Sequence, residues 1–206
     1  QRELARAVYQ GAASGRCVMA QAPTGIGKTA GTVFGMLKAV QPQALDKVFY
    51  LTAKSTGRQM ALDAAALMGR DTPALRLRVL ELTARDKACV HRDKACHGDS
   101  CPLARGFYDR LPAARHEALE AGRMEAATLR EIGLRHAVCP YYLGQELARW
   151  SDLLVGDFNY YFDGAAMLYA LATANDWRVG VLADEAHNLV ERARAMYSAS
   201  LAQADL

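Results

Sequence analysis

The stretch Met19–Thr32, MAQAPTGIGKTAGT, constrains the possible fold of this chain more than any other part of the sequence. Its central letters APTGIGKT follow the pattern Ala-x-x-Gly-x-Gly-Lys-Thr, with Ala22 where the general phosphate-loop pattern has glycine. In such a loop, backbone N–H groups surround a polyphosphate, while the lysine and the following hydroxyl reach the outer phosphates and Mg²⁺. The pattern predicts a nucleotide-binding loop formed by Ala22, Pro23, Thr24, Gly25, Ile26, Gly27, Lys28 and Thr29.

The segments on either side of this loop alternate between strand and helix signals. Apolar residues at helical spacing predict a helix over residues 1–10, and RCVMA at 16–20 indicates a short buried strand that leads into the loop. An apolar helix is expected from Thr29 to about Val40, with its positive dipole end facing the phosphates. A second strand at 47–52 and a helix at 55–68 complete an alternation that is typical of an α/β fold with a parallel sheet.

The pattern changes in the middle of the chain, at residues 83–143. This segment has no long apolar strand and holds four of the five cysteines, which predicts a small, mostly helical insertion. Residues 113–136 in particular have helical composition. We therefore expect three parts: the first half of an α/β domain at 1–82, the insertion at 83–143, and the second half of the α/β domain at 144–206.

Further strands are expected on both sides of the insertion. LRLRVLEL at 75–82 alternates arginine with apolar residues and predicts a third strand with one polar face. DLLVG at 152–156 and VGVLA at 179–183 predict two buried strands, and NYYF at 159–162 opens a helical stretch between them. All these strands are expected to belong to one sheet.

Composition narrows the class of protein only a little. The 206 residues are 51% hydrophobic, which is ample for a packed core, and the net charge of +3 permits a nucleic-acid partner without requiring one. No apolar run approaches the roughly 18 residues of a membrane span, and there is no export signal. A cytoplasmic protein without a membrane partner is therefore expected, and its cysteines are expected to be reduced or metal-bound. The chain begins inside a helix pattern, so we also expect it to be part of a longer protein.

An acidic motif, Asp184-Glu185-Ala186-His187, follows directly on the last predicted strand. In nucleotide-hydrolysing α/β domains a carboxylate at this place directs Mg²⁺. We expect Thr29 and Asp184 to hold Mg²⁺, Lys28 to contact the phosphates, and Glu185 to orient the attacking water as a general base. His187 is expected at the boundary between the nucleotide and a polymer site.

Four cysteines in the insertion have the pattern of a metal site. Cys89, Cys96, Cys101 and Cys139 are separated by six, four and 37 residues. Tetrahedral thiolate sets bind either zinc or an iron–sulfur cluster, so the residues alone leave both open. His91 and His97 are possible substitute ligands, although histidine fits an all-sulfur cluster less well. Cys101 and Cys139 each precede a proline, which favours a helix start one residue later.

In their order along the chain, the loop, the four cysteines and the acidic motif resemble the iron–sulfur helicases of superfamily 2, the XPD/DinG group. The resemblance covers nearly the whole chain. It is carried by APTGIGKT at 22–29, YLTAKSTGRQ at 50–59, CPYYL at 139–143, GDFNYYFD at 156–163 and ADEAHN at 183–188.

The resemblance implies a RecA-like motor domain that carries a 4Fe-4S cluster and uses ATP and Mg²⁺. It implies translocation on single-stranded DNA and 5′ to 3′ unwinding of forked or partly duplex DNA by a monomeric motor, in DNA repair or replication. The expected location is cytoplasmic, with a bacterial-type, nucleoid-associated function. Gln1 would be the glutamine that reads adenine. A second motor domain with the arginines that complete the ATP site, and an arch-like domain, would follow Leu206, so that this chain binds ATP but hydrolyses it poorly.

Binding of a single strand requires a basic track with aromatic side chains that stack on bases. The residues expected to contact DNA are Lys54, Ser55, Thr56, Arg85, Lys87, Tyr160 and Tyr161. Two other functions are open: a zinc-stabilised ATPase that acts on RNA, and a non-catalytic nucleic-acid-binding module that has kept the nucleotide fold. The intact Lys28, Thr29, Asp184 and Glu185 argue against the second.

Overall fold

A parallel five-stranded sheet forms the centre of the chain in a computed structural model, which describes residues 1–23, 25–72 and 76–199. The strand order is β3-β2-β4-β1-β5, and every pairing in the sheet is parallel. The strands are β1 Lys47–Leu51, β2 Val79–Glu81, β3 Arg123–Met124, β4 Leu153–Gly156 and β5 Val179–Ala183. The predicted α/β fold with a parallel sheet is therefore confirmed.

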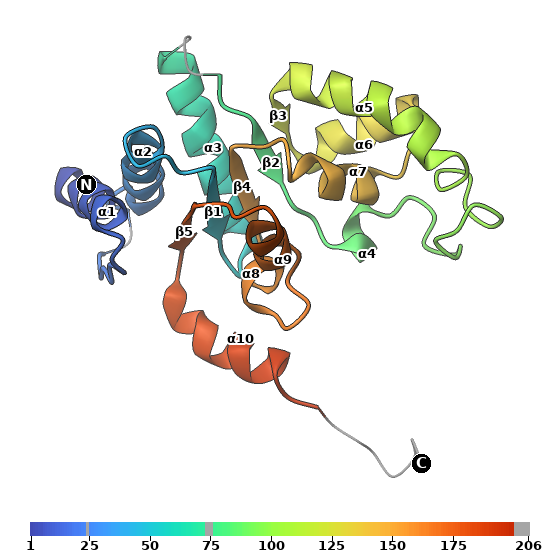
Figure 1. Cartoon of the computed structure of the whole chain (residues 1–206). Helices are drawn as coiled ribbons and strands as arrows, with labels where there is room; N and C mark the ends of the chain where they lie inside the picture. The colour runs from blue at the N-terminus through green and yellow to red at the C-terminus, as the bar shows by residue number, and fades with distance from the viewer. Residues whose placement is uncertain (24, 73–75, 200–206) are drawn as a thin grey trace.

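Helices cover both faces of this sheet, as Figure 1 shows. In chain order they are α1 Arg2–Ser14, α2 Lys28–Val40, α3 Ser55–Asp71, α4 Arg85–Ala88, α5 Phe107–Ala121, α6 Ala126–Arg135, α7 Pro140–Leu147, α8 Asn159–Phe162, α9 Met167–Ala174, η1 Ala186–Asn188 and α10 Leu189–Met196. None of the helices in the described part of the chain is long and apolar enough to cross a membrane.

The central strand β1 shows how the two faces are built. All five of its residues are buried, because helices lie on both sides of it. Val48 and Tyr50 point to the core shared with α1, α2 and α3, whereas Phe49 and Leu51 point to the core shared with α5, α6 and α7. Successive side chains of a strand point to opposite faces, so one short apolar run supports two cores.

The prediction of a strand at 16–20 is wrong. Helix α1 continues to Ser14, and Gly15 in a left-handed conformation (φ 63°) turns the chain back, so that Arg16 N donates a hydrogen bond to Gly11 O at 2.9 Å. Val18 then lies against Gly11, while Met19 is 95% exposed. This segment therefore folds back on α1 and takes no part in the sheet.

Two other elements differ from the sequence-based boundaries. The third strand is limited to β2 Val79–Glu81; residues 73–75 lie outside the described part. The helical stretch expected at 113–136 is divided, because Gly122 (φ 69°) ends α5 and β3 follows. Val79 and Leu80 of β2 pair with β3, so the insertion adds an edge strand to the sheet.

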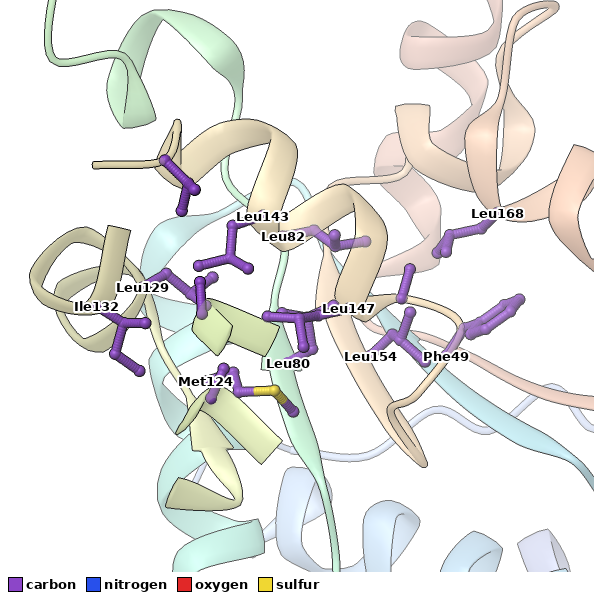
Figure 2. Close-up of a cluster of buried hydrophobic side chains, with 14 of the residues drawn as sticks. Phe49, Leu80, Leu82, Met124, Leu129, Ile132, Leu143, Leu147, Leu154 and Leu168 are labelled. Atoms are coloured by element: carbon purple, nitrogen blue, oxygen red, sulfur yellow. The ribbon is translucent and has the colours of Figure 1, made fainter. Parts of the chain in front are cut away.

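The insertion also shares its core with the sheet, as Figure 2 shows. Met124, Leu129 and Ile132 from the insertion lie in one cluster with Leu80 and Leu154 from the sheet. The side chains of this cluster are nearly all removed from water. Packing thus joins the insertion firmly to the α/β domain, and the domain boundaries at 82/83 and 143/144 stay predictions.

The shared core yields a stability prediction at Leu147, which is fully buried at the end of α7. Leu147→Ala should lower the free energy of unfolding by about 2–5 kcal/mol, because it removes buried methyl groups and leaves a cavity. The measurement is urea unfolding followed by circular dichroism. Leu134→Ala is the matched control, since Leu134 is 46% exposed; an equal loss in both variants would contradict the packing described.

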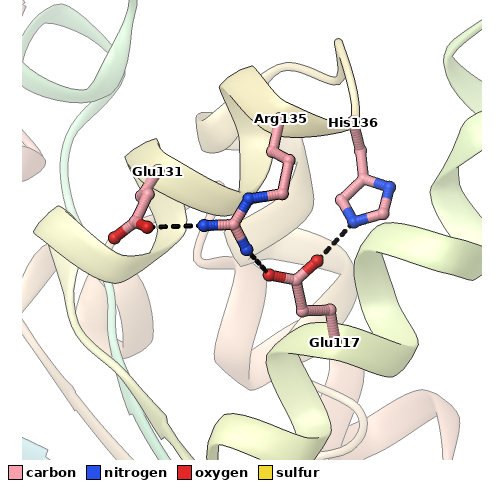
Figure 3. A network of polar contacts seen from close by, with 4 residues as sticks. All are labelled: Glu117, Glu131, Arg135 and His136. Atoms are coloured by element: carbon pink, nitrogen blue, oxygen red, sulfur yellow. Dashed lines mark hydrogen bonds and ion pairs between the residues drawn. The ribbon is translucent and has the colours of Figure 1, made fainter.

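A polar network links α5 to α6, as Figure 3 shows. Glu117 accepts a hydrogen bond from Arg135 and contacts His136 Nε2 at 2.5 Å, and Arg135 also contacts Glu131 at 2.5 Å. The hydrogen bond from His136 is the main cause that lowers the pKa of Glu117, with Arg135 adding to it. The ionised carboxylate is therefore favoured in the folded chain.

This network predicts an acid-dependent loss of stability. The ionised Glu117 carboxylate contributes fully to the stability of the folded chain above its ordinary pKa of 4.5. This contribution to stability is lost as pH falls through the lowered pKa of Glu117 in the folded chain. Between about pH 5.5 and about pH 3, wild type should lose more stability than Glu117→Gln in urea titrations. Glu131→Gln, which removes a single exposed pair, should behave like wild type; an identical pH response of wild type and Glu117→Gln would contradict the role of the network.

Candidate nucleotide-binding site

The phosphate loop, residues 22–29, has the backbone that its glycines allow. Gly25 (φ 87°) and Gly27 (φ 76°) both adopt left-handed conformations, which glycine reaches at little cost. Gly27 caps the N-terminus of α2, so Lys28 and Thr29 begin the helix. Thr24 lies outside the described residues. The loop thus directs the first amides of α2 and the side chains of its first turn toward one place, as an anion site requires.

Lys28 is held between the loop and the acidic motif. Its ammonium donates a hydrogen bond to Ala22 O at 3.2 Å and lies 3.7 Å from Glu185 Oε1. The two residues are far apart in sequence, but α2 begins near the end of β5. The chain therefore brings together the lysine and one carboxylate that the sequence assigned to a single site.

The acidic motif follows the carboxyl end of β5. Asp184 N donates a hydrogen bond to Leu51 O at 2.9 Å, which continues the pairing of β5 with β1 by one residue. Glu185 has a positive φ of 53°, a conformation that is uncommon for a residue other than glycine and occurs often at functional sites. His187 is largely exposed, with Nε2 3.6 Å from Glu185 Oε2. The carboxylates are therefore placed by the register of two parallel strands.

Thr29 has a partner that the sequence did not indicate. Tyr50 from β1 is buried, and its hydroxyl donates a hydrogen bond to Thr29 Oγ1 at 3.4 Å. Burial raises the pKa of Tyr50 above its usual value, with the Asp184 carboxylate adding to the rise, so the hydroxyl stays protonated. Thr29 is itself buried at 6% exposure. Tyr50 thus connects the loop with the strand that leads to the acidic motif.

Gln1 lies against the phosphate loop. Its side-chain amide donates a hydrogen bond to Gly27 O at 3.5 Å, and its main-chain carbonyl and Cγ lie beside Gly31. A residue at the start of the chain thus contacts the loop directly, while its proposed contact with adenine stays a prediction.

The residues expected to contact DNA fall in three places. Lys54, Ser55 and Thr56 are exposed at the N-terminus of α3, and Arg85 and Lys87 are exposed on α4. Tyr160 and Tyr161 are both half-buried on α8. The two tyrosines differ in their surroundings, and so do their possible roles.

Tyr161 belongs to an aromatic cluster, with its ring 5.6 Å from that of Phe49 in an edge-to-face arrangement. Tyr160 instead lines two adjoining hollows of about 200 and 500 Å³, and burial raises its pKa to about 12. Lys87 and Tyr141 line both hollows as well. The smaller hollow lies between the insertion and β2, the larger one extends toward Arg58 and Arg192, and neither is lined by a residue of the phosphate loop.

The cysteines of the insertion are only partly assembled. Cys139 is the N-cap residue of α7, and Pro140 follows it at the start of the helix. Burial raises the pKa of this thiol, and the proximity of Cys89 and Cys101 raises it further. Cys96 is exposed. Across the described residues, no three cysteine, histidine or acidic side chains stand close enough to hold one metal ion.

Together these features define the class of domain to which this chain belongs. A parallel α/β sheet, a Gly-Lys-Thr loop that starts a helix, and an Asp-Glu pair after a strand of the same sheet constitute a P-loop nucleotide-binding domain.

Comparisons with known proteins narrow this class to a family. The DEAD_2 family model matches residues 42–206, about four-fifths of the chain, and the chain belongs to this family. The regulator of telomere elongation helicase 1 homolog of Anopheles gambiae is 27% identical over an alignment of 180 residues, which covers 81% of this chain and 18% of that protein. ATP-dependent DNA helicase chl1 of Schizosaccharomyces pombe is 23% identical over 176 residues, 78% of this chain and 20% of that protein.

XPD-like proteins appear in both kinds of comparison. The general transcription and DNA repair factor IIH helicase subunit XPD of Dictyostelium discoideum is 27% identical over 85 residues, 40% of this chain and 11% of that protein. A solved structure of truncated XPD superposes with a TM-score of 0.58 at 19% identity, covering 92% of this chain and 53% of that one. The RecA-like fold and the relation to XPD-like helicases of superfamily 2 are thus confirmed. The chain spans at most a fifth of the curated relatives' length.

Proposed function

We propose that this chain provides the phosphate-binding half of the ATP site in an ATP-dependent DNA helicase. The observation that carries the proposal is the meeting of Lys28 and Glu185 at 3.7 Å, at one end of a parallel sheet. The relatives named above are helicases by name: one is an ATP-dependent DNA helicase, and another is the helicase subunit of a transcription and DNA repair factor. We assign the protein to DNA repair or replication.

The chemistry of the site follows from its side chains. Lys28 and the amides of the phosphate loop bind the outer phosphates of ATP, and Glu185 orients the attacking water and accepts its proton. Thr29 and Asp184 are the residues that would hold Mg²⁺, which offsets phosphate charge when bound. Lys28 Nζ lies 3.7 Å from Glu185 Oε1, and binding of the phosphates would draw the lysine away and free the carboxylate for water.

Two further residues complete the nucleotide side of the proposal. Gln1, which already touches the loop at Gly27, recognises adenine. His187 is exposed beside Glu185 and faces the polymer site. The arginines that complete hydrolysis come from a second motor domain, so this chain alone binds ATP but hydrolyses it slowly.

The insertion is proposed to hold a 4Fe-4S cluster on Cys89, Cys96, Cys101 and Cys139. All four are free thiols, and Cys89 and Cys101 lie near enough to Cys139 to raise the pKa of its thiol, although among the described residues no three of these side chains stand close enough to hold one metal ion. Cys96 is exposed, so the segment between Cys89 and Cys101 would have to bring it inward. The cluster would fix this segment to α7.

The proposed DNA path runs from α3 to α4 and α8. Lys54, Ser55 and Thr56 contact phosphates, Arg85 and Lys87 extend the basic track, and Tyr160 offers a ring for base stacking beside Lys87. Tyr161, which packs on Phe49, would support Tyr160 from the core side. The substrate would be single-stranded or forked DNA, unwound 5′ to 3′ by a monomeric motor.

The test is strand separation by the complete gene product. Duplexes with a 5′ or a 3′ single-stranded tail, of DNA and of RNA, are incubated with ATP and Mg²⁺. The proposal predicts ATP-dependent unwinding of the 5′-tailed DNA. Activity on RNA alone would instead support the zinc-stabilised RNA-dependent ATPase, and ATP-independent binding without unwinding would support a non-catalytic module.

A further inference from the structure

The N-terminal turn of α3 lies directly against the Asp184 carboxylate. Gly57 is buried in this turn, and a Cβ placed on it would lie 2.7 Å from Thr52 Oγ1 and 3.2 Å from Asp184 Oδ2. Real Cβ atoms essentially never approach another heavy atom to less than 3.0 Å. Glycine is therefore required here by the close approach of the helix backbone, because the conformation itself does not demand it.

The other two partners in this contact are fixed by the sheet. Thr52, which follows the last residue of β1, is fully buried, and its N–H donates a hydrogen bond at 3.0 Å to the carbonyl oxygen of Gly156, the last residue of β4. Asp184 N is bonded to Leu51 O at 2.9 Å. Strands β1, β4 and β5 thus hold both backbones. Of the three partners, the N-terminal turn of α3 is the one outside the sheet.

The same turn carries three of the proposed DNA contacts on its outer side. Lys54, Ser55 and Thr56 are exposed, whereas Gly57 faces inward. Lys54 N also donates a hydrogen bond to Thr52 Oγ1 at 3.5 Å, so the residue that starts the helix is linked to the buried threonine. One helical turn therefore has DNA candidates on one side and a proposed Mg²⁺ ligand on the other.

We propose that Gly57 is a positioning residue that couples DNA bound at the N-terminus of α3 to the Asp184 carboxylate. The inference rests on the proposed helicase function. Because no side chain separates the helix from Asp184, a small shift of this turn on DNA binding would be transmitted to the carboxylate, since close-packed contacts have low compressibility and transmit strain. DNA would thereby adjust the Mg²⁺ site for hydrolysis.

The test is Gly57→Ala in the complete gene product, with ATP hydrolysis measured with and without saturating single-stranded DNA over a range of Mg²⁺ concentrations. The ratio of DNA-stimulated to basal rate should fall by about 10-fold, within the usual range of coupling between two sites. The Mg²⁺ concentration for half-maximal rate should rise, while the DNA dissociation constant changes little. A defect in the helix alone would not lower the stimulation ratio and raise the Mg²⁺ requirement while leaving the DNA dissociation constant unchanged.

Gly69→Ala is the matched control, because Gly69 lies in the same helix and a Cβ there meets nothing within 4 Å. It should keep both the stimulation ratio and the Mg²⁺ response. If Gly57→Ala does not fold, the same comparison is made with Gly57→Ala in a Thr52→Ala background, which removes the nearest atom.

The outcomes separate the inference from the function on which it rests. A wild-type protein stimulated by DNA, with a Gly57→Ala variant that keeps the wild-type stimulation ratio, would overturn the coupling role alone. An equal fall of basal and stimulated rates would overturn it as well, since that marks damage to the Mg²⁺ site without coupling. Absence of stimulation in the wild type would refute the proposed function and the inference with it.

Discussion

Lys28→Ala is expected to weaken ATP binding by about 10- to 100-fold, because it removes a charge-assisted contact worth about 1.5–3 kcal/mol. The lysine lies at the start of α2, where its ammonium is within 3.7 Å of Glu185 and within 3.2 Å of the loop carbonyl of Ala22. No other lysine or arginine side chain in the described chain makes an ion pair with Glu185. A titration of the chain with a fluorescent ATP analogue measures the effect.

Lys38→Ala is the control for this experiment. Lys38 lies in the same helix and is exposed. Its Nζ atom lies 5.7 Å from the centroid of the Phe34 ring, away from the loop. Its replacement removes the same charge from the chain without touching the proposed site. An equal loss of affinity in both variants would indicate a general electrostatic effect, and unchanged affinity in Lys28→Ala would contradict the phosphate-binding role.

Cys139→Ser is expected to abolish the visible absorption and the bound iron and sulfide of the anaerobically purified chain. Cys139 is the N-cap residue of α7, and Cys89 and Cys101 lie near enough to raise the pKa of its thiol. A serine hydroxyl is a poor ligand for iron in place of a thiolate. In the complete gene product we also expect unwinding to fall more than ATP hydrolysis, because the insertion loses its link to α7.

Cys17→Ser is the matched control, since Cys17 is an exposed free thiol in the segment that folds back on α1. It should keep the absorption and the iron content of wild type. Retained absorption in Cys139→Ser would contradict its assignment as a ligand. A colourless wild-type chain with one stoichiometric zinc would replace the iron–sulfur assignment by a zinc site.

Much of the sheet was predictable because its buried strands are short apolar runs. The strands expected at 47–52, 152–156 and 179–183 are found within one residue of their predicted ends. The segment 16–20 is equally apolar, yet it folds back on α1, since Gly15 reverses the chain there. Local composition cannot distinguish these cases, because pairing depends on a neighbouring strand. The two-residue strand β3 is too short to give any periodic signal.

The site residues also fall into a group that the sequence predicted and a group that it did not. Lys28 and Glu185 were predicted because each belongs to a motif whose spacing reflects phosphate chemistry, and the structure places them together. Tyr50 and Gly57 were not predicted as site residues, because their contacts with Thr29 and Asp184 arise from the register of β1 and β5 and from the seating of α3. Both residues lie in YLTAKSTGRQ at 50–59, a segment that carries the family resemblance, but neither was assigned a role there.

The central claim is that this chain carries the phosphate-binding and water-orienting groups of a DNA-dependent motor. Steady-state ATP hydrolysis by the complete gene product, with and without single-stranded DNA, tests it most directly when wild type is compared with Glu185→Gln. The account predicts DNA-stimulated hydrolysis in the wild type, and a variant that still binds ATP but loses hydrolysis by about 100-fold or more, the scale of general base catalysis. A wild-type rate that is indifferent to DNA, or a Glu185→Gln rate equal to that of wild type, would contradict it.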